Sequence, residues 1–581
     1  MSGLIKLLRG GVFAALGLYI ALRITKLLRK VQFQRLKGRI KREQRDRTPL
    51  PRLKSLAPFL EQKILACSAS ELAQKIRTKE FSCEEVVTCY IRRAYNIGRS
   101  LNLIAEEAYL PALETAKKFD RALAKGKPPK GILYGVPISV KDHIAMKGAC
   151  TSCGITNACD IPDMEDAVVL QLLKEQGAIP FVRSNVPQAL AWIETDNYIY
   201  GRSLNPWDTS RSTGGSSGGE GGLIASRASP LGIGTDSAGS IRVPCAFCGV
   251  YGYKPTAERV SELGIYSPLP HRHSPFGHLK MSVVGPMGRS VEDLILFMKS
   301  IWTPKHFEYD KIVPPLVFNE ELFQSTLKRK LRIGYYINDG QFECCPSVER
   351  SIRETVKKLS EAGHEVVEFQ LPNFRELLEN IISLLSSDNW KFLEDMLQGE
   401  PAKWYFRPGL VARHFVFFKS VTTSILEFLG EYRIGHLLKL TGEKTADKTM
   451  KNFNYKEKYA EELIEKWMQE DIDVLLCPTW PLPAIKHKFS LKLFIANNYA
   501  LLFNLLRLPA GIIPVSEVFP EECRYSSVWK DAATSTSQQN MLNAEGLPVT
   551  IQLVGLPFRD ELTLAAMKVV EDLCGTHKFA S

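Results

Sequence analysis

Short apolar segments of strand type alternate with amphipathic segments of helix type along most of this chain of 581 residues. The strand-like segments are rich in Val, Ile and Leu, and they are residues 132–140, 178–182, 331–336, 474–477, 511–515 and 549–555. Helical periodicity occurs in residues 166–176, 348–362, 455–469 and 561–573. Alternation of this kind predicts an α/β fold in which helices cover both faces of a β-sheet.

The net charge of +12 is concentrated near the N-terminus. Residues 23–47 contain eleven Lys and Arg residues against only Glu43 and Asp46, so the rest of the chain is nearly neutral. A protein that binds nucleic acid with its folded body carries basic residues over that body. We therefore expect no nucleic-acid partner.

The first thirty residues have the composition of a membrane anchor. Residues 10–22 are thirteen uncharged residues between Arg9 and Arg23. This segment is shorter than the ~20 residues of a spanning helix, unless both arginines extend their side chains to the interfaces. A helix that lies in the interface is the alternative, and both remain open. A secretory signal peptide is disfavoured because the segment has no Ala-x-Ala-like cleavage site. The basic tract that follows predicts a cytoplasmic location for the body of the protein.

Three regions are predicted: a membrane anchor at residues 1–30, a basic stalk and linker at 31–60, and one globular domain at 61–581. The linker contains three prolines between residues 47 and 58. Within the globular domain, residues 410–440 carry apolar residues every three or four positions, with cations on both sides. This pattern predicts either a buried helix pair or a cap that enters a membrane.

The thirteen cysteines are scattered and odd in number, which favours reduced thiols in a cytosol-facing protein. Cys150 with Cys153 and Cys245 with Cys248 form two CxxC pairs, but these are 92 residues apart. The ten histidines form no zincin motif. We therefore expect no metal and no cofactor.

Residues 214–222 contain six glycines in nine positions, and this tract allows several interpretations. A flexible linker is the simplest. A phosphate-binding loop is excluded because no Gly-Lys-Ser/Thr follows at the required spacing. The tract also contains overlapping G-x-S-x-G matches centred on Ser216 and Ser217. A nucleophile elbow must follow a buried strand, whereas residues 205–213 are polar and rich in turn formers, so the α/β-hydrolase interpretation fails.

Two further positions carry chemistry. Ser240 ends the segment Gly234-Thr-Asp-Ser-Ala-Gly-Ser240, and small residues before a serine allow backbone N–H groups to converge as an oxyanion hole requires. Lys141 ends an apolar strand-like run. A solvated lysine is the simple alternative. Burial would lower its pKa by ~3 to 5 units from ~10.4, and a neutral lysine can act as a base.

These segments together resemble the amidase signature family. The matching segments are Tyr134-Gly-Val-Pro-Ile-Ser-Val-Lys141-Asp, Gly214-Gly-Ser216-Ser217-Gly-Gly, Gly234-Thr-Asp236 to Arg242, Gly252-Tyr-Lys254-Pro-Thr, Gly285-Pro-Met-Gly-Arg289-Ser-Val-Glu-Asp293 and Gly546-Leu-Pro-Val-Thr-Ile-Gln552-Leu-Val-Gly555. They occur in family order. Within the family, the chain is most similar to the fatty acid amide hydrolases of vertebrate type, in length, in its N-terminal anchor and in residues 214–221, 229–236, 247–249 and 504–511.

The resemblance implies roles for the matching residues. Lys141 is expected to be the general base and later acid, Ser216 the bridging serine beside a cis peptide, and Ser240 the nucleophile that forms an acyl-enzyme. The expected oxyanion donors are the backbone N–H groups of Ser237, Ala238, Gly239 and Ser240. The expected supporting residues are Ser217, Asp236 and Arg242. The implied fold is one large mixed sheet between helices, and the implied assembly is a homodimer.

Two residues depart from the family pattern. Ala238 stands where the signature has glycine, and alanine would be strained there if the backbone needed a positive φ. Arg507 stands where the similar vertebrate hydrolases carry an acidic residue. Both departures leave activity expected and substrate choice open.

The expected function is hydrolysis of long-chain fatty acid amides, such as N-acylethanolamines or primary fatty amides, to fatty acid and amine. The expected location is an endomembrane, such as that of the endoplasmic reticulum. Alternatives are a broad amidase acting on small amides, a transamidating subunit acting on glutaminyl substrates, and a membrane scaffold that has lost activity. The anchor weighs against the transamidating subunit, and only Ala238 hints at the scaffold.

Overall fold

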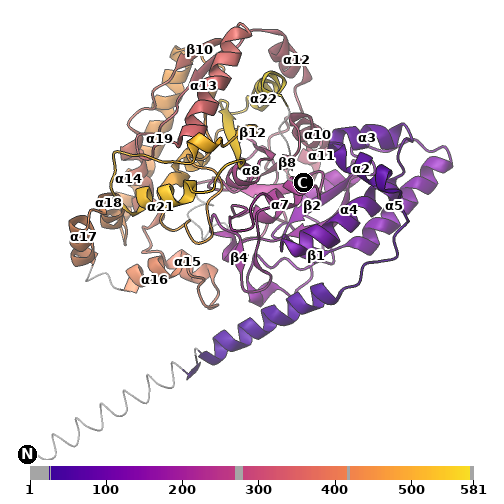
Figure 1. Ribbon diagram of the computed structural model, residues 1–581, viewed down its shortest axis with the longest axis horizontal. Helices are drawn as coiled ribbons and strands as arrows, with labels where there is room; N and C mark the ends of the chain where they lie inside the picture. Colours follow the sequence, from indigo (N-terminus) through magenta and orange to yellow (C-terminus); the bar gives the residue numbers. More distant parts are fainter. Residues whose placement is uncertain (1–24, 27, 269–278, 415–418, 576–581) are drawn as a thin grey trace, which may run out of the picture.

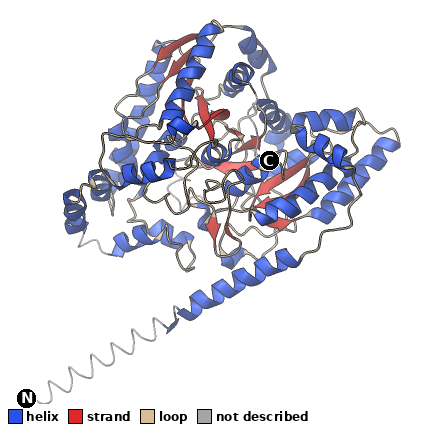
Figure 2. Cartoon of the chain, viewed as in Figure 1, coloured by secondary structure: helices blue, strands red, loops and turns tan. Residues whose placement is uncertain are grey.

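The computed structural model describes residues 25–26, 28–268, 279–414 and 419–575. Figures 1 and 2 show a broad body with a long N-terminal helix along one edge. The predicted membrane segment, residues 10–22, lies outside the described residues. Among those that are described, no helix is long and apolar enough to cross a bilayer.

The centre of the body is an eleven-stranded mixed sheet. Its strands are β1 (Ile104–Glu107), β2 (Pro137–Lys141), β3 (Ile179–Ser184), β6 (Gly232–Asp236), β7 (Tyr251–Lys254), β8 (Val283–Gly288), β9 (Arg332–Tyr335), β10 (Glu365–Glu368), β11 (Val474–Pro478), β12 (Ala510–Glu517) and β13 (Pro548–Val554). Their order is β1-β3-β2-β6-β8-β7-β12-β13-β11-β9-β10. The pairs β2·β3, β2·β6, β9·β10 and β9·β11 are parallel and the others antiparallel. A separate short ladder joins β4 (Asp196–Asn197) to β5 (Gly201–Arg202).

Helices surround this sheet. In the first half of the chain they are α2 (Pro58–Ala66), α3 (Ala69–Arg77), α4 (Cys83–Arg93), α5 (Tyr109–Ala124), α6 (Val168–Glu175), α7 (Gly218–Ala225), α8 (Arg242–Cys248) and α10 (Val291–Ile301). In the second half they are α11 (Pro304–Tyr309), α12 (Glu320–Lys328), α13 (Pro346–Glu361), α14 (Phe374–Leu385), α15 (Lys391–Met396), α16 (Arg407–His414), α17 (Lys419–Phe428), α18 (Tyr432–Leu440), α19 (Ala446–Gln469), α20 (Asn498–Leu505), α21 (Ala532–Met541) and α22 (Asp560–Cys574).

Two large apolar clusters lie on opposite faces of the sheet. Strand β11 contributes Val474 and Leu476 to one cluster and Leu475 and Cys477 to the other. Successive side chains of a strand point to opposite faces, so each cluster is the core of one face. The predicted α/β fold with helices on both faces is confirmed.

All six predicted strands and all four predicted helices are present, with shifted ends. Strand β2 begins at Pro137 rather than at 132, because Gly135 has φ +83° in a turn. Helix α19 begins nine residues before its predicted start, where the Thr445 side chain accepts the Lys448 N–H. Strands β1, β6, β7, β8 and β10 were missed. Strand β6 reads Gly-Ile-Gly-Thr-Asp, which has little intrinsic strand preference.

The basic N-terminal segment is helical over residues 28–47 and lies against the body. Lys41 pairs with Glu106 at 2.6 Å and Lys37 with Asp160 at 2.9 Å. At Gly38 a side chain would meet a backbone carbonyl, because its Cβ would lie 2.4 Å from Tyr198 O. Residues 49–57, before α2, have no regular secondary structure. The three-region division of the chain stays a prediction.

Candidate active site

The sheet brings Lys141 and Ser240 to one edge. Lys141 is the last residue of β2, and Ser240 lies four residues beyond the end of β6. Strands β2 and β6 are parallel neighbours, so their carboxyl ends meet. Ser216 comes from the glycine-rich loop before α7, and its Oγ lies 2.7 Å from Lys141 Nζ. The structure therefore brings Lys141 and Ser216, which the resemblance predicts to be the base and the bridging serine, into direct contact.

Lys141 has no solvent exposure. Burial lowers its pKa to about 7, against the opposing charges of Asp236 and Glu220. Its Nζ also donates to Thr235, at 2.8 Å to Oγ1 and 3.3 Å to the carbonyl oxygen. A lysine in this state exchanges a proton near neutral pH.

The glycine-rich tract is buried and ordered by close contacts. The peptide bond between Gly215 and Ser216 is cis. A Cβ on Gly215 would lie 2.3 Å from Trp192 O, and one on Gly218 would lie 2.2 Å from Thr195 Oγ1. The flexible-linker interpretation is therefore wrong, because these glycines allow other backbone and side-chain atoms to approach closely.

Ser217 joins the two serine-bearing loops. Its N–H donates to Ser240 O at 3.1 Å, and its Oγ donates to Thr235 O at 3.2 Å. The residue is fully buried. Ser217 therefore supports the two loops and does not face solvent.

Asp236 organises the turn that carries Ser240. Its carboxylate accepts the N–H groups of Gly239 at 2.7 Å and Ile241 at 3.2 Å, and an Asn504 Nδ2–H at 2.9 Å. It also pairs with Arg242 at 2.9 Å, with both side chains fully buried. Although burial opposes ionisation, the Arg242 guanidinium holds the pKa of this carboxyl well below its usual range. A buried, fully bonded ion pair of this kind fixes backbone geometry.

The backbone before Ser240 shows whether Ala238 needs the positive φ that would strain an alanine. Ala238 does not have a positive φ, whereas Gly239 has φ +103°. A Cβ on Gly239 would also lie 2.7 Å from the Ala500 Cβ. The glycine requirement therefore falls on Gly239, which is a glycine, and Ala238 is unstrained.

The four predicted oxyanion donors differ in their hydrogen bonding. The Gly239 N–H already donates to Asp236. Among the described residues, the N–H groups of Ser237, Ala238 and Ser240 have no acceptor within the chain. Ser237, Ala238 and Ser240 are partly exposed. Of the four predicted donors, Gly239 is thus the one that is already engaged.

A family model described as Amidase matches residues 85–564 of this chain. The chain belongs to the amidase signature family. It is a hydrolase that acts on carboxamide C–N bonds.

Similar proteins of the amidase signature family cover nearly the whole chain. Fatty-acid amide hydrolase 1 of Sus scrofa is 36% identical over 517 residues, which are 88% of this chain and 86% of that protein. Acetamidase of Emericella nidulans is 30% identical over 547 residues, which are 90% of this chain and 92% of that protein. A solved structure of a fatty acid amide hydrolase superposes with a TM-score of 0.75 at 25% identity, covering 94% of this chain and 95% of that one.

Sequence reasoning missed three buried residues of this amidase site, namely Thr235, His143 and Glu220. Thr235 Oγ1 lies between Lys141 Nζ at 2.8 Å and His143 Nε2 at 2.7 Å. The Glu220 carboxyl accepts the Ser139 hydroxyl at 2.5 Å, and burial raises its pKa to about 7. Both Thr235 and Glu220 lie inside motif segments, but composition gives no sign that Thr235 contacts the lysine or that Glu220 lies close enough to influence its pKa.

Other predicted features of the amidase lie apart from these residues. Arg507 follows α20 and pairs with Glu457 at 3.4 Å. No disulfide forms among the thirteen cysteines, and the described part of the chain has no group of three metal-binding side chains. The CxxC segments therefore form no recognisable zinc site there.

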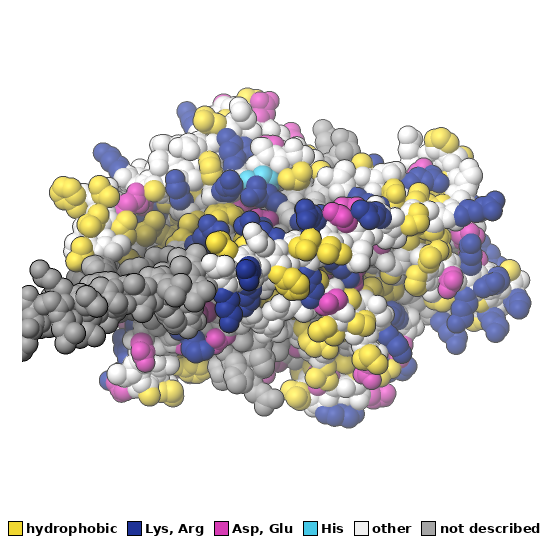
Figure 3. Space-filling model, turned by 90° about the horizontal axis from the view of Figure 1, so that it is seen from below, with side chains coloured by type: hydrophobic (Ala, Val, Ile, Leu, Met, Phe, Trp, Pro, Cys, Tyr) yellow, Lys and Arg dark blue, Asp and Glu magenta, His cyan; other side chains and the backbone are white. Residues whose placement is uncertain are grey.

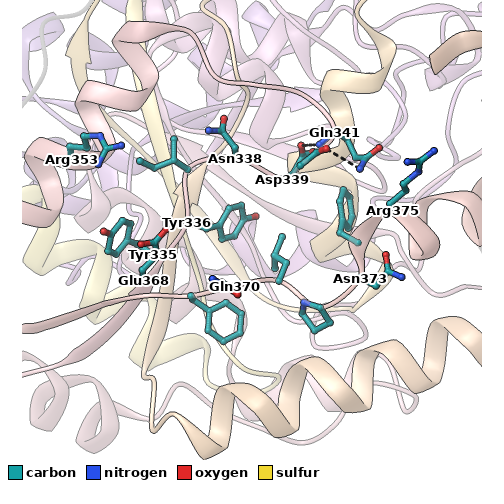
Figure 4. Close-up of a pocket in the computed structure, with 16 residues that line it drawn as sticks. Tyr335, Tyr336, Asn338, Asp339, Gln341, Arg353, Glu368, Gln370, Asn373 and Arg375 are labelled. Atoms are coloured by element: carbon teal, nitrogen blue, oxygen red, sulfur yellow. Dashed lines mark hydrogen bonds between the residues drawn. The ribbon is translucent and has the colours of Figure 1, made fainter. Parts of the chain in front are cut away.

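Two cavities open elsewhere on the described surface of the amidase. One of about 580 Å³ lies between β9, β10, α13 and α14, with Tyr336, Asp339 and Arg375 in its wall (Figure 4). The other, about 860 Å³, is lined by Ala145, Cys153 and Asp163. Neither wall includes Ser216 or Ser240.

Proposed function

We propose that this amidase hydrolyses long-chain fatty acid amides at a membrane through an acyl-enzyme on Ser240. The observation that carries the proposal is the contact of buried Lys141 with Ser216, beside the loop of Ser240. The similarity to a protein named fatty-acid amide hydrolase 1 supports the substrate class.

In the proposed first step, neutral Lys141 accepts the Ser216 proton while Ser216 accepts the Ser240 proton. The Ser240 oxygen attacks the amide carbonyl and forms a C–O bond. The backbone N–H groups of Ser237, Ala238 and Ser240, which have no acceptor among the described residues, hold the developing oxyanion, whereas that of Gly239 is engaged by Asp236. Each such donor contributes typically ~2.7 to 4 kcal/mol to the transition state.

The proton then returns from Lys141 through the serines to the amide nitrogen, and the C–N bond breaks. Protonation is required because an amide anion is a very poor leaving group. A water molecule, deprotonated by the same relay, attacks the acyl-enzyme and releases the fatty acid and Ser240.

The surface around α17 supports a membrane contact. Its apolar side chains include Phe428, which is 89% exposed, and Ile425, which is 53% exposed. Of the described residues in α17 and α18, only Thr423, Arg433 and Gly435 are buried, which does not fit an ordinary buried helix pair. An apolar helix face beside cationic side chains is suited to the boundary of a bilayer.

The N-terminal helix provides a second membrane-facing candidate. Residues 28–47 expose Phe33, Leu36 and Ile40 on one side, between many cations. Figure 3 shows Lys and Arg side chains mixed with hydrophobic ones over the face that carries this helix. We include in the proposal an anchor within residues 1–30, a cytoplasm-facing body on an endomembrane and assembly as a homodimer.

A second candidate function is hydrolysis of small soluble amides, which the similarity to acetamidase favours. Hydrolysis of oleamide and of acetamide by the detergent-solubilised full chain separates the two, with Ser240→Ala as the control. Strong Ser240-dependent preference for oleamide supports the lipid amidase, and equal or greater turnover of acetamide supports the second candidate.

The inactive scaffold needs its own test. A serine-directed fluorophosphonate labels an activated Ser240 in either enzyme. Absence of labelling in the wild type, together with no turnover of either amide, would overturn both enzymatic candidates.

A further inference from the structure

His143 stands at the far end of a short hydrogen-bonded chain that reaches Lys141. It follows β2 by two residues and is nearly buried, with 5% exposure. Its Nε2 lies 2.7 Å from Thr235 Oγ1, which itself accepts from Lys141 Nζ at 2.8 Å. The ring is therefore one hydroxyl away from the amine.

The backbone fixes which ring nitrogen carries the proton. His143 Nδ1 lies 2.7 Å from Tyr266 O, and a carbonyl oxygen can only accept, so Nδ1 is the donor. The main chains of the two residues are also joined, because Tyr266 N–H donates to His143 O at 2.9 Å. An adjacent bridge between Ile144 and Ile265 keeps the two segments together.

A ring that carries its proton on Nδ1 accepts at Nε2 from the Thr235 hydroxyl. A hydroxyl has one proton. When the Thr235 hydroxyl donates its hydrogen bond to His143, its Oγ1 can only accept a hydrogen bond from Lys141.

Because Thr235 Oγ1 can then only accept, the orientation of the neutral Lys141 amine is fixed. A neutral amine has two N–H donors and one lone pair. Thr235 takes both donors, at Oγ1 and at its carbonyl oxygen, so the lone pair is left for the Ser216 hydroxyl 2.7 Å away. We propose that His143 is a positioning residue that, through Thr235, directs the lone pair of Lys141 at Ser216.

The inference rests on the proposed role of Lys141 as the base. Without an acceptor at position 143, the Thr235 hydroxyl is able to rotate and donate to the neutral amine. That hydrogen bond would stabilise the neutral form in an orientation that turns the lone pair away from Ser216. The titratable groups that face Lys141 itself, Asp236, Glu220 and Cys153, are unchanged by such a substitution.

The test compares His143→Asn with His143→Gln. The amide nitrogen of Asn replaces Nδ1 but leaves no acceptor at the Nε2 position, whereas the amide oxygen of Gln supplies one. For His143→Asn we expect kcat on oleamide to fall about tenfold, the loss of roughly one productive hydrogen bond, with KM within about twofold. The acid limb of kcat/KM should move to lower pH by roughly 0.5 to 1 unit, because the neutral amine is stabilised. His143→Gln should keep the wild-type limb.

Further variants separate positioning from folding. The melting temperature shows whether His143→Asn folds. If it does not, His143→Leu takes its place, because it also lacks the acceptor and should give the same shift of the acid limb. In a Thr235→Val background, where no hydroxyl can compete, adding His143→Asn should leave the limb unchanged. A fall in kcat with an unmoved limb in His143→Asn, or equal shifts in the Gln and Asn variants, would overturn the inference. Full activity of Lys141→Ala would instead overturn the proposed base itself.

Discussion

Gly218 in α7 and Gly409 in α16 are both glycines of short helices, but their surroundings differ completely. A Cβ on Gly218 would lie 2.2 Å from Thr195 Oγ1, whereas a Cβ on Gly409 would have Leu393 Cδ1 as its nearest neighbour at 3.8 Å. Helix α7 is buried along its whole length. The α17 helix that follows α16 instead exposes Ile425 and Phe428.

The two regions differ in how tightly their side chains and backbone are packed. Around Lys141, close backbone approach, a bonded Asp236 and buried serines hold the proposed catalytic groups Lys141 and Ser216 within hydrogen-bond distance. In α16 to α18, loose packing and exposed apolar side chains leave a surface that another apolar phase can cover. Substitutions around Lys141 should therefore change the rate of hydrolysis, and substitutions in α16 to α18 should change membrane binding.

The largest expected effect is that of Lys141→Ala. Loss of the proposed base should lower kcat on oleamide by roughly 10²- to 10⁴-fold, the usual contribution of a general base. Circular dichroism and the melting temperature check that the fold is retained. Lys280→Ala, which removes an exposed lysine paired with Glu258, is the matched control and should be fully active. Near-normal turnover by Lys141→Ala would rule out the relay.

Gly218→Ala and Gly409→Ala compare the effect of one added methyl group on the free energy of unfolding at a tightly packed and at an open position. At Gly218 the added methyl group must displace Thr195, and overpacking of this kind destabilises by about 1 to 3 kcal/mol. At Gly409 the space is open and the same methyl should stabilise by roughly 0.5 to 1 kcal/mol. Urea unfolding measures both. Similar free energies of unfolding for the two variants would contradict the difference in packing.

Ile425→Ser with Phe428→Ser should weaken membrane binding without touching chemistry. Each exposed side chain that enters the bilayer boundary contributes up to about 1.5 to 3 kcal/mol, so partial insertion of two predicts a ten- to hundredfold loss of binding. Flotation with vesicles measures it, and labelling of Ser240 by fluorophosphonate should be unchanged.

The matched control for this membrane test is Phe59→Ser, which removes an aromatic residue of α2 that is 77% exposed. It should bind vesicles as the wild type does. An equal loss in both variants would mean that general surface hydrophobicity, rather than α17, mediates binding.

The smallest expected effect is set by pH. Lys141 has its pKa lowered to about 7 by burial, so its neutral form is present above that pH and is lost below it. We expect kcat/KM to rise with pH, to reach half of its plateau near pH 7, and to fall about tenfold per unit well below it. A limb near the ordinary lysine value would contradict a buried neutral base.

Much of the candidate site could be predicted from the sequence because its motifs resemble those of the amidase signature family. Lys141 ends an apolar strand-like run, and Ser216 and Ser240 lie in short segments rich in glycine and serine. The sequence could not place Thr235, His143 or Glu220, since their roles depend on where β2, β6 and α7 lie relative to one another. It likewise missed strand β6, which is held by its neighbours rather than by its own composition.

The alternation of apolar segments by itself determined the α/β class and several elements, among them α13, α19 and α22, because one buried face per helix and two per central strand are properties of local periodicity. Only the tertiary structure decided whether Ala238 needs a positive φ, which predicted oxyanion N–H is already engaged, and that the Thr235 hydroxyl lies between Lys141 and His143. Those answers depend on distances between segments far apart in the chain, and a hydrogen bond or steric clash changes over less than 1 Å.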